Sequence, residues 1–470
     1  MPDPTPSEDE LDRTIRAYLA RQSARPQPPD LVESTLARAL AGHRRAALPR
    51  RPAAAVTLAA VAAVALVAVA AVAVHLSARR SAPRASPPPS ASSVPSASSS
   101  PAPWLAFGLP SGFSATSISC PGAGECWVLG TSSTSSTQSS LAVYRYSGDA
   151  WTSVSIPASL DIDDLACVAA DDCWAVGSLV PPAGIDTDGI LQPVIEHSTG
   201  GPFTVVSSPV MTGLDKLAAV TCVTGDDCWA VGGYGSQTIV QTPGNPNATE
   251  IVVSHPLVEH YDGTGWTTLT VAAPAGNSAL SAVTCVSAAN CWAVGQEYGG
   301  GVLIEQYSGG AWAAVSSPQI TGNPGGTLSA ITCATADDCW AVGSEGPPET
   351  ATAPTQQSLA LHYTGGDWTV VPSPDITSAN GGGLAGIACV SPDDCWAVGT
   401  ANGPLWDLIG TPPPGEVQAV IEHWTGSSWA TVPSPQAGGE GSGLAGISCA
   451  PSTGDCYAVG DSLFLTLTGS

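Results

Sequence analysis

From residue 104 onward the chain repeats one short pattern, Cys-x5-Cys-Trp-Ala-Val-Gly, and this repeat limits the folds that the chain can adopt. Five copies follow the pattern fully, while the first and the last carry small variations. The seven copies together use all 14 cysteines, as the pairs Cys120 and Cys126, Cys167 and Cys173, Cys222 and Cys228, Cys285 and Cys291, Cys333 and Cys339, Cys389 and Cys395, and Cys449 and Cys456. Such regularity indicates a protein built from similar modules.

Each copy contains four short apolar or alternating segments bounded by turn residues, which is the pattern of β-strands. In one copy an apolar run at 217–221 precedes the first cysteine, and Trp-Ala-Val-Gly follows the second. An alternating segment at 257–261 and a strand that starts at Trp266 complete that copy. Successive copies are 47 to 63 residues apart, and four strands at roughly this period are typical of propeller blades. The predicted fold is therefore all-β, a seven-bladed β-propeller of four-stranded blades.

The two ends of the repeated region complement each other. The last copy has a third strand at 463–467 but no tryptophan strand, whereas an unassigned tryptophan strand at 103–108 precedes the first cysteine pair. Pairing these segments would complete the seventh blade and remove the exposed sheet edges at the seam. The propeller domain is thus predicted to span 103–470.

The blades resemble those of bacterial, actinobacterial-type, membrane-anchored extracytoplasmic propellers, and remotely those of the Asp-box and kelch groups. The turn at 262–266, Asp-Gly-Thr-Gly-Trp, is similar to an Asp-box but lacks the leading Ser-x-Asp. The resemblance therefore implies the shape of the blade and no particular function.

Each cysteine pair flanks a short connection between the first two strands of a blade. Paired across a hairpin, two cysteines come to roughly the 5.5 Å Cα separation of a disulfide. Seven disulfides are predicted, each closing a short loop and each worth about 2 kcal/mol. The alternative is metal binding by thiolates, but the repeat contains no third ligand, and neither a metal site nor a cofactor is predicted.

A membrane span is predicted at 52–78, because this stretch contains no Asp, Glu, Lys or Arg and is long enough to cross a bilayer as a helix. The alternatives are a buried core helix and a cleaved signal peptide, although about fifty residues precede the run. Five arginines lie shortly before the span and three shortly after it, at 79, 80 and 84. This bias places the N-terminus in the cytoplasm and the propeller outside the plasma membrane, which agrees with cysteines that occur only after the span.

The segments that flank the span differ in composition. Residues 1–51 contain two short amphipathic patterns, typical of a small helical cytoplasmic segment that a regulatory partner could bind. This segment resembles the N-terminal part of anti-sigma-type membrane proteins, although the zinc motif of many such proteins is absent. Residues 79–102 are rich in Ser, Pro and Ala and are predicted to form an extended stalk.

Charge is distributed unevenly and excludes one class of partner. Twelve of the 14 basic residues lie before residue 104, and the propeller has only Arg145 and Lys216 against 32 of the 39 acids. A surface this acidic repels nucleic acid, so no nucleic-acid partner is predicted.

Several polar residues recur in register from blade to blade. The third strands carry His197, His260, His362 and His423, three of which directly follow a glutamate; His362 follows Leu361. Asp-Asp pairs precede the second cysteine in several blades. An active site requires a unique constellation, so the repeated Glu and His are interpreted as framework hydrogen bonds. The repeated tryptophans are interpreted as packing between blades. The Asp-Asp pairs lie in hairpin turns, where local hydrogen bonds favour aspartate. A ring of these acids could alternatively attract divalent cations.

The candidate binding face carries the connections between second and third strands, near 178–192, 232–255, 344–357 and 400–417, because variable loops on a rigid scaffold are where binding usually resides. The candidate binding residues in these loops are Asp186, Asp188, Tyr234, His255, Glu349, Trp406 and Asp407. No catalytic motif is present, so an enzyme is not predicted.

We interpret the chain as a membrane-anchored binding or sensing propeller for a glycan, cell-wall or protein ligand. A carboxylate-dependent glycan-active enzyme and a ligand-free scaffold remain as alternatives, because the 32 acids of the propeller would supply a glycosidase pair.

Overall fold

The structure is a computed structural model that describes thirteen segments of the chain, all of them after residue 103. The described residues are 104–135, 138–157, 160–179, 192–209, 215–240, 249–271, 277–298, 301–320, 325–346, 357–374, 382–401, 417–435 and 443–468. No helix in these segments is long and apolar enough to span a membrane. The predicted span at 52–78 lies outside the described residues, as do the segments predicted at 1–51 and 79–102.

The described residues form seven sheets of four strands each. Blade 1 contains β2 (Phe113–Gly122), β3 (Glu125–Ser135), β4 (Gln138–Ser147) and β5 (Ala150–Val154). Blade 2 contains β6 (Leu160–Ala169), β7 (Asp172–Leu179), β8 (Pro193–Ser198) and β9 (Thr204–Val206). Blade 3 contains β10 (Lys216–Thr224), β11 (Asp227–Val240), β12 (Thr249–Tyr261) and β13 (Trp266–Leu269). Blade 4 contains β14 (Ser278–Ser287), β15 (Asn290–Glu297), β16 (Gly301–Ser308) and β17 (Ala311–Ala314).

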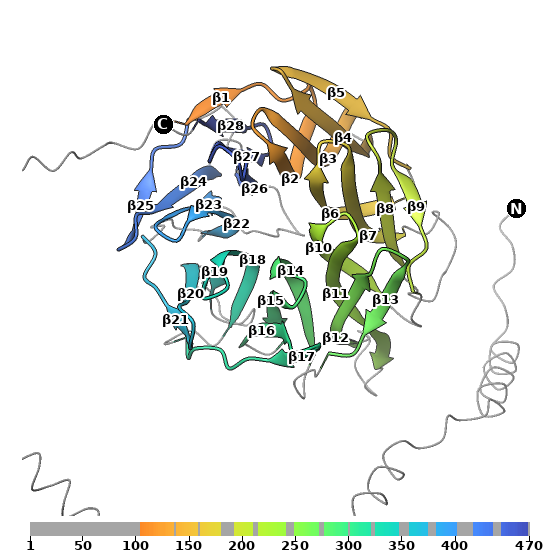
Figure 1. Cartoon of the computed structure of the whole chain (residues 1–470), viewed down its shortest axis with the longest axis vertical. Coiled ribbons are helices and arrows are strands. Elements are labelled where there is room, and N and C mark those ends of the chain that lie inside the picture. The colour runs from red at the N-terminus through yellow and green to blue at the C-terminus, as the bar shows by residue number, and fades with distance from the viewer. Residues whose placement is uncertain are drawn as a thin grey trace, which may run out of the picture. The chain divides into compact units, whose positions relative to one another are not determined.

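The remaining blades follow the same order of antiparallel neighbours. Blade 5 contains β18 (Gly326–Thr335), β19 (Asp338–Glu345), β20 (Gln357–Tyr363) and β21 (Trp368–Val370). Blade 6 contains β22 (Gly382–Ser391), β23 (Asp394–Ala401), β24 (Gln418–Trp424) and β25 (Trp429–Val432). Blade 7 contains β26 (Leu444–Cys449), β27 (Cys456–Gly460), β28 (Phe464–Leu467) and, from the start of the domain, β1 (Leu105–Phe107). The sheets stand around a common axis with their first strands innermost (Figure 1), which confirms the predicted seven-bladed propeller.

Blade 7 joins the two ends of the domain. Strand β1 pairs antiparallel with β28, with Leu105 opposite Thr466 and Phe107 opposite Phe464. Trp104, which directly precedes β1, is 3% exposed and packs edge-on against Trp396 of blade 6, with ring centroids 5.4 Å apart. Two contacts therefore fix the N-terminal strand: its backbone pairs with β28 within blade 7, and the buried indole of Trp104 packs against blade 6.

All seven predicted disulfides are present, each within one blade. Their Cα atoms are 4.0 to 4.1 Å apart, closer than the roughly 5.5 Å expected. The reason is register: Cys222 lies directly opposite Cys228 on the neighbouring strand, and other pairs repeat this arrangement. Directly opposite residues of antiparallel strands have short Cα separations.

Tryptophans pack between neighbouring blades, as predicted. Trp174 of β7 contacts Trp266 of blade 3 edge-on, with ring centroids 5.4 Å apart. The same contact recurs along the ring, and Phe203 takes the place of the fourth-strand tryptophan against Trp127. Edge-to-face aromatic pairs are favourable beyond the apolar area that they bury. The core is thus divided among the seams between blades.

The repeated histidines form framework hydrogen bonds, as predicted, and their partners are the aspartates of the hairpin turns. His260 stacks on Trp229 at a centroid distance of 4.0 Å, and its Nε2 lies 2.9 Å from Oδ1 of Asp227. Three further blades repeat this arrangement. Blade 1 replaces it with Arg145, which pairs with Glu125 and lies over Trp127 at 5.7 Å. These groups are therefore engaged in structural contacts.

One predicted loop is largely strand. The connection expected at 232–255 is instead a continuation of the β11–β12 pair, which stays in register from Cys228 opposite Tyr261 to Val240 opposite Thr249. The segments Thr238–Val240 and Ile251–Val253 are rich in β-branched residues, which favour strands. The prediction of a loop at 232–255 is therefore wrong over most of its length.

We expect Trp104→Ala to destabilise the ring, because it removes a buried indole from the closing seam. The free energy of unfolding should fall by about 3–5 kcal/mol, the usual cost of truncating a buried Trp. The matched control is Leu105→Ala, whose side chain is 51% exposed and whose loss should cost less than about 0.5 kcal/mol. Urea unfolding followed by tryptophan fluorescence measures both; equal stability of the two variants would contradict this account of closure.

Candidate functional site

The innermost strand of every blade carries a β-bulge at the same place. In blade 2 the register with β7 shifts between Ile162 and Asp164, which leaves Asp163 as the extra residue. The other six blades shift at the equivalent position. A bulge changes the direction of a side chain relative to a regular strand.

The glycine of the Trp-Ala-Val-Gly motif is required by this bulge. Gly177 lies opposite Ile162, and a Cβ added to it would clash with the carbonyl oxygen of Asp161. The motif glycines of the other blades are equally close to the backbone of their inner strands. The repeated glycine therefore has a steric cause, which is the close approach of the bulged strand.

The extra residues of the bulges line a cavity of about 320 Å³ on the propeller axis. Going around the ring from blade 1, these residues are Thr116, Asp163, Ala218, Ser281, Ser329, Ala385 and Ala445. The residues that follow them also line it, and they are small in most blades, as at Ala219, Ala282 and Gly386. The bulge thus exposes one position of each blade to a shared central space.

Blade 2 breaks the symmetry of this cavity. Asp163 and Asp164 stand where other blades place Thr, Ser, Ala or Gly, and they are the acids that line the cavity among the described residues. The repeated framework gives no reason for an acid in blade 2 alone. The lining is otherwise similar in every blade, so the two acids of blade 2 are the feature that a purely structural cavity would not require.

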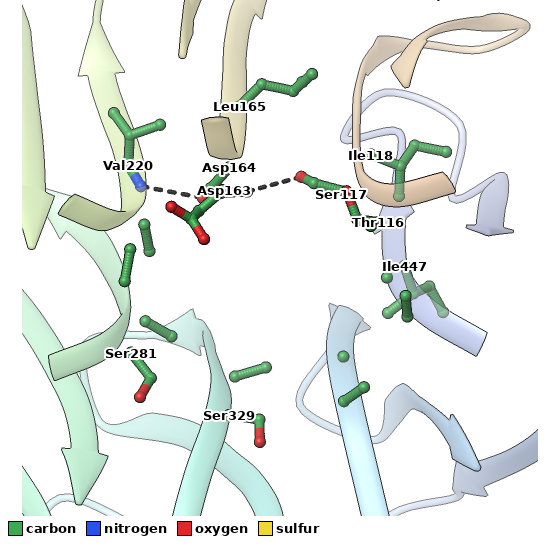
Figure 2. Close-up of a pocket in the computed structure, with 18 of the residues that line it drawn as sticks. Thr116, Ser117, Ile118, Asp163, Asp164, Leu165, Val220, Ser281, Ser329 and Ile447 are labelled. Atoms are coloured by element: carbon green, nitrogen blue, oxygen red, sulfur yellow. Dashed lines mark hydrogen bonds between the residues drawn. The ribbon is translucent and has the colours of Figure 1, made fainter. Parts of the chain in front are cut away.

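Asp164 joins three blades. Its Oδ1 accepts a hydrogen bond from the Ser117 hydroxyl of blade 1 at 2.7 Å, and its Oδ2 accepts one from the Val220 amide of blade 3 at 3.0 Å. Figure 2 shows the two aspartates between these partners. Burial raises the pKa of Asp164, while the Ser117 and Val220 hydrogen bonds act in the opposite direction. Both donors favour the ionised carboxylate.

Asp163 has one cationic neighbour. Nζ of Lys216, the only lysine of the chain, lies 2.8 Å from its Oδ1. Burial raises the pKa of Asp163 to about 6, and Asp161 and Asp164 add to this effect, whereas Lys216 opposes it. Oδ2 of Asp163 is buried and accepts no hydrogen bond from the described residues. This oxygen itself is covered, but the Asp163 side chain as a whole is 28% exposed and lines the cavity, so its carboxylate can accept a hydrogen bond from a donor that enters.

The structure describes only two of the residues predicted from the variable loops. Tyr234 and His255 lie directly opposite each other on β11 and β12, with ring centroids 5.3 Å apart, and neither lines the axial cavity. The other five predicted residues lie outside the described segments: Asp186, Asp188, Glu349, Trp406 and Asp407.

Sequence reasoning missed Asp163 and Asp164, although a signal was present. Aligning the seven inner strands on their first cysteine shows acids at these two positions in one copy alone. As for metal ions, no group of three or more His, Cys, Asp or Glu side chains comes together as a set of ligands within the described segments.

No protein-family model and no curated protein matches the chain. Among solved structures it is similar to "YCF48 bound to D1 peptide", with 13% identity, a TM-score of 0.46, and coverage of 79% of this chain and 99% of that one. YCF48 from Cyanidioschyzon merolae is similar at 15% identity and a TM-score of 0.45, over 78% of this chain and 99% of that one. The extracellular domain of the putative one component system BT4673 from B. thetaiotaomicron shares 9% identity at a TM-score of 0.45, over 78% of this chain and 40% of that one.

We expect Asp164→Ala to destabilise the propeller by about 2–4 kcal/mol, because it leaves the Val220 amide and the Ser117 hydroxyl without their acceptor. Asp164→Asn should cost less than about 1 kcal/mol, since an amide oxygen can accept from Val220 while the amide nitrogen donates to the serine oxygen. Ser329→Ala, at a cavity-lining position of blade 5, is the control and should leave stability unchanged. Denaturant midpoints provide the measurement, and a stable Asp164→Ala variant would show that the three-blade contact is dispensable.

Proposed function

We propose that this protein is a membrane-anchored receptor whose extracytoplasmic propeller binds its ligand at the axial cavity. The observation that carries the proposal is the break in symmetry at Asp163 and Asp164. Asp164 also holds three blades together, but Asp163 projects from the bulge at the cavity, and no other blade has an acid at either position among the described residues.

The chemistry of the cavity favours a ligand that donates hydrogen bonds. The Asp163 carboxylate lines the cavity, and the remaining lining among the described residues is uncharged, with small residues at most bulges and Ile, Leu or Val beside them. The propeller carries 32 acids against two bases, so its field disfavours anionic ligands. Hydroxyl-rich glycans, amino sugars of cell-wall fragments and the amine groups of protein ligands meet these conditions.

A binding role is supported over hydrolysis by how the axial acids are held. A glycosidase needs one carboxyl group that is free to donate a proton and a second that acts as base or nucleophile. Asp164 already accepts two hydrogen bonds, and Asp163 is paired with Lys216. Both belong to a paired inner strand, which suits a fixed recognition surface.

We expect a screen of glycans, cell-wall fragments and peptides against soluble 104–470 to yield a ligand whose affinity falls about tenfold with Asp163→Asn, the loss of one charge-assisted hydrogen bond. Asp262→Asn is the matched control, because Asp262 lies in an exposed turn of blade 3 and does not line the cavity. If Tyr234→Ala abolishes binding and Asp163→Asn does not, the ligand binds at the loop face and the axial proposal fails. Release of a cleaved product in the same screen would favour the enzyme instead.

The cytoplasmic segment supplies the second half of the proposed receptor. We expect a chain that lacks residues 1–51 to lose its co-purifying cytoplasmic partner while its propeller binds ligand with unchanged affinity, because the two functions lie on opposite sides of the proposed span. Co-purification from membranes, with a ligand-binding assay on the same samples, measures both. Unchanged partner recovery without 1–51 would remove the output arm of the receptor.

A further inference from the structure

Four glutamates are fully buried at seams between blades. Each stands on the third strand of its blade, on the face turned toward the preceding blade, and each is 0% exposed: Glu196, Glu259, Glu305 and Glu422. An ionised carboxylate at such a position has lost its water and needs strong partners in compensation.

Two of these glutamates receive a partner across the seam. The Ser208 hydroxyl, at the end of blade 2, lies 3.1 and 3.0 Å from the two carboxylate oxygens of Glu259 in blade 3. The Ser373 hydroxyl, at the end of blade 5, lies 2.9 and 2.8 Å from those of Glu422 in blade 6. Both serines belong to the Ser-Pro sequence that closes a blade.

The other two glutamates lack this partner. Where the serine would stand, blade 1 has Ile156 and blade 3 has Val271. All four oxygens of Glu196 and Glu305 are buried, and none has a hydrogen-bond partner among the described residues. The seams between blades 1 and 2 and between blades 3 and 4 therefore each contain an unsatisfied acid.

Charged groups on the surrounding strands are already engaged. In the blades that contain or border Glu196 and Glu305, Arg145 pairs with Glu125, His197 with Asp172, His260 with Asp227, and His362 with Asp338. Burial also raises the pKa of Glu259 and of Glu422 to about 7, although the hydrogen bonds from Ser208 and Ser373 act in the opposite direction. Asp215 adds to the rise at Glu259. For Glu196 and Glu305 burial alone acts, and it raises the pKa of each to about 7.

We infer that the propeller is a proton-responsive fold, in which Glu196 and Glu305 take up protons as the pH falls through neutrality and the two seams that contain them become more stable. The proton comes from solvent and neutralises the buried carboxylate, so no other reactant is needed. The seam that holds Glu196 is also crossed by the hydrogen bond from Ser117 to Asp164, so its cohesion bears on the wall of the axial cavity.

The sign of the effect follows from the direction of the shifts. In the folded chain the pKa of each glutamate is about 7, against 4.5 in the unfolded chain. Between these values the folded state binds more protons, so stability is full below about pH 4.5, falls as the pH rises toward 7, and changes little above it.

The test is the denaturant midpoint of the full-length protein at pH 5, 6, 7 and 8. The wild-type midpoint should fall as the pH rises, and Glu196→Gln with Glu305→Gln should remove at least half of that fall and unfold at a higher denaturant concentration at pH 8. A wild-type midpoint that does not change between pH 5 and 8, or an unchanged slope in the double variant, overturns the inference.

Two single variants keep the inference testable if the double variant does not fold. Val271→Ser gives Glu305 the hydroxyl that Glu422 has, and Ser373→Ala removes it from Glu422. The carboxylic-acid C=O stretch in the infrared, followed against pH, should shift its titration to lower pH in Val271→Ser and to higher pH in Ser373→Ala. Identical titrations in both variants and the wild type overturn the inference.

Discussion

The contact on which the structure depends is the edge-on packing of a second-strand tryptophan against the aromatic ring that opens the fourth strand of the next blade. Trp174 with Trp266 and Trp396 with Trp104 are two instances of it. Because each blade completes the burial of this tryptophan against its neighbour, no blade is complete alone, and closure of the ring gives the first and last blades a neighbour as well. The disulfides hold each hairpin, but they do not join blades.

A second constraint, the β-bulge of each inner strand, produces the axial cavity. The motif glycine allows a bulged inner strand to approach closely, and the bulge aims one side chain of each blade at the axis. The scaffold can therefore keep its framework residues unchanged while the axial position varies. Blade 2 has Asp163 and Asp164 at these variable positions, and this is where we propose that the nearly regular ring recognises its ligand.

Buried acids are a consequence of composition as well as of geometry. With two basic residues in the propeller, both of them already paired, its interior carboxylates depend on hydroxyls, amides or protons for compensation. Ser208 and Ser373 provide that compensation at two seams, and Ile156 and Val271 do not at two others. Proton uptake is the remaining route to a satisfied seam.

The amino-acid sequence alone predicts the all-β class, the seven blades, the disulfide pairs and the structural role of the repeated Trp and His. These follow from spacing, because residues that recur at one register in every module must occupy equivalent places. Three features depend on the folded arrangement: Asp163 faces the axis, and β11 and β12 extend through an expected loop. Glu196 and Glu305, in addition, have no hydrogen-bond partner among the described residues at their seams. These features depend on β-bulges and on contacts between blades that are far apart in the chain. The local periodicity of the sequence predicts neither.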